Sequence, residues 1–143
     1  MKSLAQCFDD EPTDVFDKLG ALVSAPAITV APATPLTEVQ RLLVQYRVPA
    51  IAVVADDGGV CGIVTRTDVL RELGDDDATA ADAMSGFVFT LPVGAYVEKA
   101  AALMAVEGVG QVLVIDRHGR LAGMVSALDI ARHFAALAGY SVA

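Results

Sequence analysis

The sequence predicts an α+β protein made of two tandem copies of one folding unit, and three observations support this prediction. The 143 residues match themselves without gaps at an offset of 61 positions, so that residues 23–71 align with 84–132 and ten of these 49 positions are identical. Self-similarity at a fixed offset is the signature of a structural repeat. Both copies alternate strand-like apolar runs with helix-like amphipathic segments. Hydrophobic residues make up 55% of the chain, which excludes general disorder.

Each copy is expected to begin with a short strand and an amphipathic helix. The strands are expected over 28–30 and 89–91. A helix is expected next because apolar residues recur three or four positions apart. These residues are Leu36, Val39, Leu42, Leu43 and Tyr46 in the first copy and Val97, Ala100, Leu103 and Met104 in the second. Gly108 is expected to end the second of these helices.

Two further strands and a closing helix complete each copy. The strands are predicted over 50–55 and 60–64 in the first copy, and over 111–116 and 121–125 in the second. Their near-continuous apolar runs indicate that both faces of the sheet are covered. The closing helices are predicted to start near Asp68 and Asp129. A further helix is predicted before each copy, over about 12–23 and 80–84, with Thr79 as the N-cap of the second.

The predicted organisation has four parts, and the charge is concentrated in two of them. Residues 1–21 form an acidic arm and helix, 22–73 the first repeat, 74–80 an acidic linker and 81–140 the second repeat. The net charge of −8 arises wholly from residues 1–20 and 72–82, and the rest of the chain is balanced. No face can therefore be strongly basic, which excludes a binder of the nucleic-acid backbone.

The remaining composition favours a cytoplasmic protein without a membrane partner. No run of about 18 apolar residues is present, and the first apolar stretch is too short for a signal peptide. Two cysteines, Cys7 and Cys61, give no disulfide framework, and Cys61 is expected to be a reduced core residue. Catalytic and metal sites are not expected. His118 and His133 lie 15 residues apart without metal-ligand spacing, and no P-loop or nucleophile elbow is present.

One short motif closes both copies and has two interpretations. It is Gly-h-h-Thr/Ser-x-x-Asp, where h is apolar, and it occurs as GIVTRTD over 62–68 and GMVSALD over 123–129. The hydroxyl and the acid can form a capping box at the start of a helix. Alternatively, the acid can accept hydrogen bonds from a vicinal diol, and the helix start can bind an anion. The local sequence alone favours capping.

This order of elements, repeated with this motif, resembles the CBS-domain pair, also called a Bateman module. The resemblance covers nearly the whole chain after residue 12. It implies two CBS repeats (β-α-β-β-α, each with a preceding helix) packed as a pseudo-two-fold pair in a stand-alone protein. It also implies a sensor that binds AMP, ADP or ATP as a regulatory ligand, not an obligatory cofactor, in the clefts between the repeats. In that context ligand binding is preferred over capping alone.

The resemblance implies a set of ligand-binding residues in each repeat. They come from the motif, from the first short strand and from the start of the next strand. The first repeat contributes Thr65, Asp68, Arg66, Arg47, Ile28, Pro49 and Ala50, and the second contributes Ser126, Asp129, Phe89, Gly110 and Gln111. The aspartates would hold the ribose hydroxyls. Ala127 and Gly108 replace the two arginines in the second repeat, so the first site is better equipped for phosphate.

Each of these residues also has a simpler interpretation. Ile28 and Phe89 can be core residues, Gln111 can face solvent, and the arginines can form surface ion pairs. Arg71 and Arg132 follow the aspartates by three residues, which favours pairing along the helix.

At the level of the whole protein, Ala-rich helices such as 100–106 and 131–138 indicate a homodimer, with an unidentified regulated protein as a further partner. The alternative functions are an interaction scaffold with empty clefts and a binder of S-adenosylmethionine or NAD(H).

Overall fold

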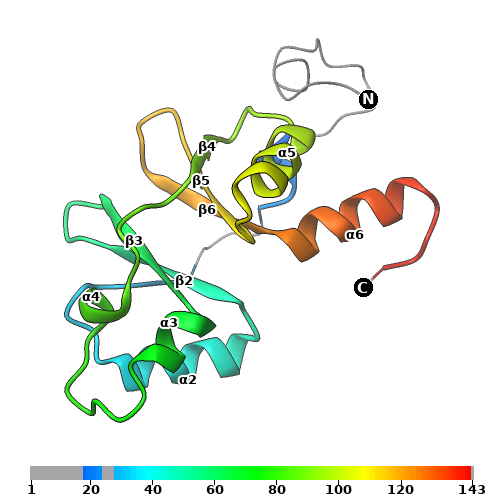
Figure 1. Cartoon of the computed structure of the whole chain (residues 1–143). Coiled ribbons are helices and arrows are strands. Elements are labelled where there is room, and N and C mark those ends of the chain that lie inside the picture. The colour runs from blue at the N-terminus through cyan, green and yellow to red at the C-terminus, as the bar shows by residue number, and fades with distance from the viewer. Residues whose placement is uncertain (1–17, 24–27, 143) are drawn as a thin grey trace. The chain divides into compact units, whose positions relative to one another are not determined.

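The computed structural model describes residues 18–23 and 28–142, which form two compact units (Figure 1). The first-repeat unit contains residues 28–88 together with 119–121. The second-repeat unit contains residues 18–23, 89–118 and 122–142. Within the described ranges no helix is long and apolar enough to cross a membrane.

The first-repeat unit has a three-stranded sheet in the order β1-β2-β3. β1 runs parallel to β2, and β2 runs antiparallel to β3. In Figure 1 helices α2 and α3 lie together on one side of these strands. The elements are β1 (Thr29–Val30), α2 (Leu36–Tyr46), β2 (Ala50–Val54), β3 (Val60–Thr65), α3 (Arg66–Arg71) and α4 (Ala80–Ala83). Strand β2 is buried from Ala50 to Val53, as its apolar sequence predicts.

The second-repeat unit repeats this arrangement with strand order β4-β5-β6, and β4 runs parallel to β5. The elements are the 3-10 turn η1 (Leu19–Ala21), β4 (Thr90–Pro92), α5 (Val97–Glu107), β5 (Gln111–Ile115), β6 (Leu121–Ser126) and α6 (Ala127–Leu137). Each unit has its own apolar core, which includes Ile51 and Val64 in the first and Val114 and Val125 in the second. The predicted α+β fold with two tandem repeats is confirmed.

The segment that precedes each repeat in the sequence packs on the unit of the other repeat. Residues 78–85 lie against the first-repeat unit, where Ser85 and Ile63 exchange two backbone hydrogen bonds of 2.9 and 3.0 Å. Residues 18–23 lie against the second-repeat unit, where Leu19 is fully buried and its N–H donates to Ala95 O at 2.8 Å. The compact units therefore follow packing and not chain order.

A helix was predicted before each repeat, and the part of the chain that the structure describes contains only one of the two. Helix α4 forms as predicted, with Thr79 as its N-cap. The helix predicted over 12–23 is wrong for residues 18–23, where only the single turn η1 forms, and residues 12–17 lie outside the described ranges. The N–H groups of Leu19 and Gly20 instead donate to Ala95 O and Val93 O, so they are not available to a helix that runs in from residue 12.

Candidate functional site

The motif of the first repeat forms a complete capping box at the start of α3. Asp68 Oδ2 accepts hydrogen bonds from Thr65 N at 2.8 Å and from Thr65 Oγ1 at 2.9 Å. In return, Asp68 N donates to Thr65 Oγ1 at 3.3 Å. The other carboxylate oxygen, Oδ1, is paired with Arg71 Nη1 at 3.3 Å. Asp68 is 8% exposed and is the one buried charged residue in the described ranges.

The motif of the second repeat has the same cap but different surroundings. Asp129 Oδ2 accepts from Ser126 N at 2.8 Å and from Ser126 Oγ at 2.9 Å. Asp129 is half-buried. No ion pair joins it to Arg132 among the residues the structure describes, so the predicted helix pairing is confirmed for Arg71 and wrong for Arg132. The exposed arginine extends into solvent there.

A third capping box shows that this local geometry also occurs outside the repeated motif. Thr79 and Asp82 at the start of α4 make the same three hydrogen bonds, with Asp82 Oδ2 accepting at 2.8 and 3.0 Å. Asp82 is exposed and no strand start adjoins its cap in the sheet pairing. What distinguishes Asp68 and Asp129 is therefore their position at one end of a sheet, next to the first residues of the central strand. This end is called the edge below.

In the first-repeat unit the sheet brings the other expected residues to the Thr65 cap. Ala50, the first residue of β2, is the register partner of Thr65 at the end of β3. Arg66 N donates to Pro49 O at 3.4 Å, which closes the same edge. Ile28 immediately precedes β1, whose parallel pairing with β2 places it at this end of the sheet. Its side chain is half-buried against the core.

The second-repeat unit repeats this edge with different side chains. Ala127 N donates to Gly110 O at 2.9 Å, as Arg66 N does to Pro49 O in the first repeat. Gln111 begins β5 and is half-buried. Phe89 O accepts from Leu113 N at 2.9 Å, and the phenyl ring packs partly buried against the core. The expected residues of each repeat are thus gathered at one edge of their own unit.

Two arginines of the first repeat, Arg66 and Arg47, were predicted as phosphate-binding residues. Arg66 and Arg47 are exposed, and within the described ranges neither guanidinium has an ion pair. Arg47 ends α2 with φ of 53°, the one positive φ outside glycine in the described residues. Its counterpart Gly108 ends α5 with φ of 68°, as predicted for a helix stop. A left-handed backbone favours glycine, so Arg47 is held there at a cost in strain.

The structure explains the motif glycines, for which sequence reasoning gave no role. A Cβ on Gly62 would lie 2.5 Å from the backbone oxygen of Ser85 and 2.9 Å from Met84 Sδ. A Cβ on Gly123 would overlap the side chain of Val23. Both neighbours belong to the segments described above, which precede one repeat in the sequence and pack on the unit of the other. Their equal placement in the two copies was the available signal, because a repeated glycine in a strand indicates a close backbone approach.

Other candidate chemistry is limited in the described ranges. No group of three His, Cys, Asp or Glu side chains there could hold a metal ion. Cys61 is a free, half-buried cysteine that packs against the first-repeat core. Cys7 lies outside the described residues.

Two α+β units, each with a capped helix against the start of its central strand, define a tandem-repeat module. The sequence pattern of the CBS domain matches residues 19–75 and again residues 80–136. The chain belongs to the CBS-domain family. A CBS-domain pair is typically a regulatory module and not a catalytic one, although it also occurs within enzymes.

Similar proteins of known structure or name support this placement. L-aspartate semialdehyde sulfurtransferase of Methanocaldococcus jannaschii is 26% identical over 113 residues, which are 79% of this chain and 22% of that protein. The chain thus spans about a fifth of this curated relative.

Two solved structures share the fold. The first is the CBS domain pair of protein MJ0100 in complex with 5′-methylthioadenosine and S-adenosyl-L-methionine. It is 25% identical, with a TM-score of 0.78 over 85% of this chain and 98% of that one. The second is the cytosolic domain of the Mg²⁺ channel MgtE in complex with ATP. It is 25% identical, with a TM-score of 0.70 over 82% of this chain and 48% of that one.

Proposed function

We propose that this chain is a cytoplasmic regulatory sensor that binds an adenine nucleotide, AMP, ADP or ATP. The observation that carries the proposal is a geometry found in both repeats. An aspartate of a helix-capping box lies next to the first residues of the central strand. The exposed Thr79–Asp82 cap lacks this setting. Membership of the CBS family and relatives with bound adenosyl ligands give further support.

The chemistry of the edge suits an adenosyl group. A carboxylate is an acceptor only, and the cap occupies Oδ2 of Asp68, so Oδ1 is the oxygen that would accept from the ribose hydroxyls. Pro49 and Ala50 bring an apolar strand start to the same edge, which suits the face of an adenine ring. Arg66 and Arg47 supply guanidinium groups for phosphate, and the second repeat has no arginine at these positions.

A second candidate ligand is S-adenosylmethionine. The observation that favours it is the 25% identity to a CBS domain pair with that compound bound. Its ribose and adenine would make the same contacts, but it has no phosphate and its sulfonium is a cation, so its single carboxylate is the one group that could pair with Arg66 or Arg47. The two arginines therefore favour the nucleotides.

A thermal-shift comparison of adenosine, AMP, ATP and S-adenosylmethionine tests the proposal. A ligand at 100 times its Kd should stabilise the folded chain by about 2.7 kcal/mol. We expect ATP to reach this stabilisation at a lower concentration than adenosine, AMP or S-adenosylmethionine. A shift with S-adenosylmethionine alone would establish the second candidate. The absence of any shift would leave the chain as an interaction scaffold.

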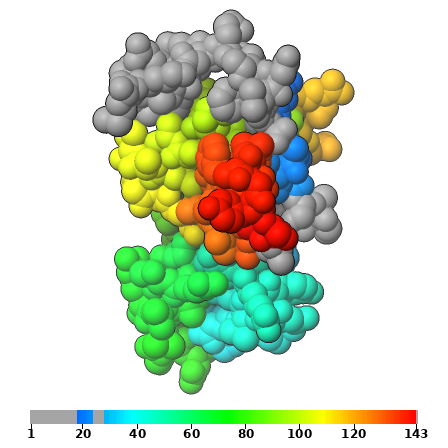
Figure 2. Space-filling model, turned by 90° about the vertical axis from the view of Figure 1, so that its right-hand side faces the viewer, coloured from blue at the N-terminus to red at the C-terminus, as the bar shows by residue number. Residues whose placement is uncertain are grey.

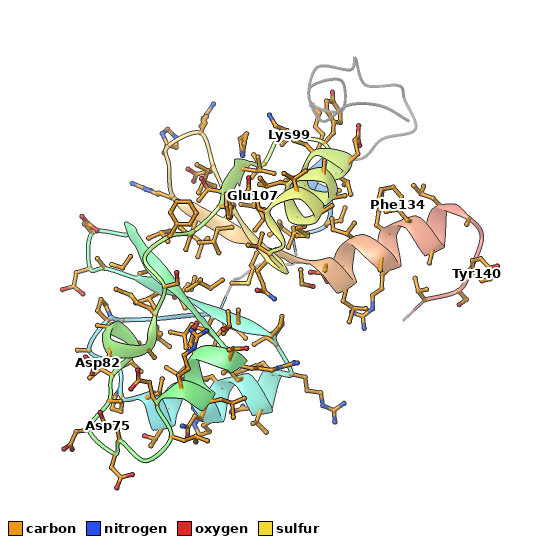
Figure 3. All side chains as sticks on the ribbon, in the orientation of Figure 1. Asp75, Asp82, Lys99, Glu107, Phe134 and Tyr140 are labelled. Atoms are coloured by element: carbon orange, nitrogen blue, oxygen red, sulfur yellow. The ribbon has the colours of Figure 1, made fainter. Side chains whose placement is uncertain are left out.

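We further propose that the chain forms a homodimer through its helices. Helix α6 is strongly amphipathic, yet of its apolar residues only Ile130 is buried. Phe134 and Leu137 lie on the same face of the helix as Ile130, four and seven residues later, and are 40% and 51% exposed. The orange-to-red surface of α6 and of the residues after it faces the viewer in Figure 2, and Phe134 and Tyr140 are labelled in Figure 3. Adjoining exposed apolar side chains of this kind mark interaction surfaces.

A further inference from the structure

The two motif aspartates have the same cap but differ at the oxygen that faces away from it. In both repeats Oδ2 accepts two hydrogen bonds from the N-cap residue. In the first repeat Oδ1 is also paired with Arg71, at 3.3 Å. In the second repeat the equivalent Arg132 makes no such pair within the described part of the chain. The sequences at these positions are identical, so the difference lies in the surroundings.

Arg71 engages the oxygen that the proposed ligand would use. Because the cap occupies Oδ2, a ribose must be held mainly through Oδ1, where the guanidinium already donates. The Asp68 side chain is 10% exposed and cannot turn away without breaking its cap, whereas the Arg71 side chain is 72% exposed. The pair joins a buried carboxylate to a mostly exposed guanidinium across one helix turn, and its exposed end is open to water and salt, which weaken it. Arg71 can therefore be displaced by a ligand, but at a cost.

We propose that Arg71 sets the affinity of the first-repeat site by competing with the ribose hydroxyls for Asp68 Oδ1. This inference rests on the proposed function. It makes the two sites unequal for an uncharged nucleoside: the second-repeat site binds adenosine a few-fold more tightly, and phosphate contacts at the first-repeat site offset the competition when the ligand is a nucleotide. The first repeat is also the one that carries Arg66 and Arg47.

Calorimetric titration with adenosine, on full-length protein, tests this inference. Arg71→Gln keeps most of the side-chain stem and removes the charge. It should strengthen adenosine binding at one site by about twofold to fivefold, the range expected for loss of an ion pair whose guanidinium is mostly in solvent. The matched variant Arg132→Gln should bind adenosine as the wild type does. Both residues are exposed, so both variants should fold, which circular dichroism checks.

The salt dependence gives a second readout of the same competition. Adenosine is uncharged, so its own contacts change little with ionic strength. Raising the salt concentration should strengthen its binding to the wild type and leave Arg71→Gln unchanged. Weaker or unchanged binding by Arg71→Gln would overturn the competition. The proposed function itself would fail differently, through the absence of binding of both adenosine and ATP to the wild type.

Discussion

Gly62 lies against the backbone of residue 85 in the first-repeat unit. Its missing side chain leaves room for Ser85 O, which would otherwise lie 2.5 Å from a Cβ atom. Ser85 also exchanges two backbone hydrogen bonds with Ile63, the residue that follows Gly62. The packing of residues 84–85 therefore requires a glycine at position 62, and this requirement involves no ligand.

Gly62→Ala should destabilise the fold by about 1–3 kcal/mol, the range for overpacking a filled site. The affected neighbour is backbone, which cannot yield by a rotamer change. Gly94→Ala is the matched control, because a Cβ there has nothing within 4 Å and its φ is not left-handed. Urea unfolding of both variants measures the difference. Equal stability of the two variants would contradict the packing argument.

Arg47 has a left-handed backbone conformation, which a residue with a side chain adopts at a cost in strain. Replacing it by glycine, the residue found at the equivalent position 108, should raise the free energy of unfolding by about 1 kcal/mol. The same change should weaken the binding of ATP more than that of adenosine if the guanidinium contacts phosphate. Chemical unfolding and calorimetry on Arg47→Gly measure the two effects. A variant that is more stable and binds ATP unchanged would remove Arg47 from the site.

At the scale of elements, sequence periodicity predicted most of the secondary structure. Helix α2 spans the predicted residues because its apolar positions at 36, 39 and 43 are buried, and β2 is buried along the predicted run. The exception is the segment before the first repeat, where residues 18–20 bond to a distant segment in place of a helix. Long-range backbone pairing of this kind leaves no periodic signal in a short segment.

The site was predictable only in part for the same reason. The capping boxes follow from Thr/Ser-x-x-Asp spacing, which is local. The grouping of Pro49 with Arg66, and the pairing of Arg71 but not Arg132, depend on the sheet register and on tertiary surroundings. No spacing within one repeat encodes them.

The helix caps provide a controlled test of whether Asp68 is more than a cap. Asp68→Asn and Asp82→Asn alter the same box, one at the sheet edge and one at the exposed end of α4. Both should change stability by less than about 1 kcal/mol, because the amide oxygen of asparagine can still accept from the N–H of the N-cap residue. Only Asp68→Asn should weaken ATP binding, by ~1.5–3 kcal/mol, the value of a charged hydrogen bond. Unchanged affinity in both variants would reduce Asp68 to a capping residue.

At the scale of the whole molecule, the exposed helix faces predict self-association. Light scattering should give twice the chain mass at micromolar concentration. Leu137→Glu places a charge on the apolar face of α6 and should yield monomers. Arg117→Glu, in the exposed turn after β5, is the control and should stay dimeric. A wild-type mass of one chain at all concentrations would contradict the dimer.

The central claim is that a carboxylate in each repeat holds the ribose of an adenosyl ligand, and removing one ribose hydroxyl tests it most directly. Titration calorimetry of the full chain compares ATP with 2′-deoxy-ATP, which keeps the adenine and the phosphates. The account predicts that the deoxy compound binds more than about tenfold more weakly, through loss of a hydrogen bond to a charged group. It also predicts that Asp68→Asn with Asp129→Asn abolishes this preference. Equal affinity of the wild type for the two nucleotides would contradict the account.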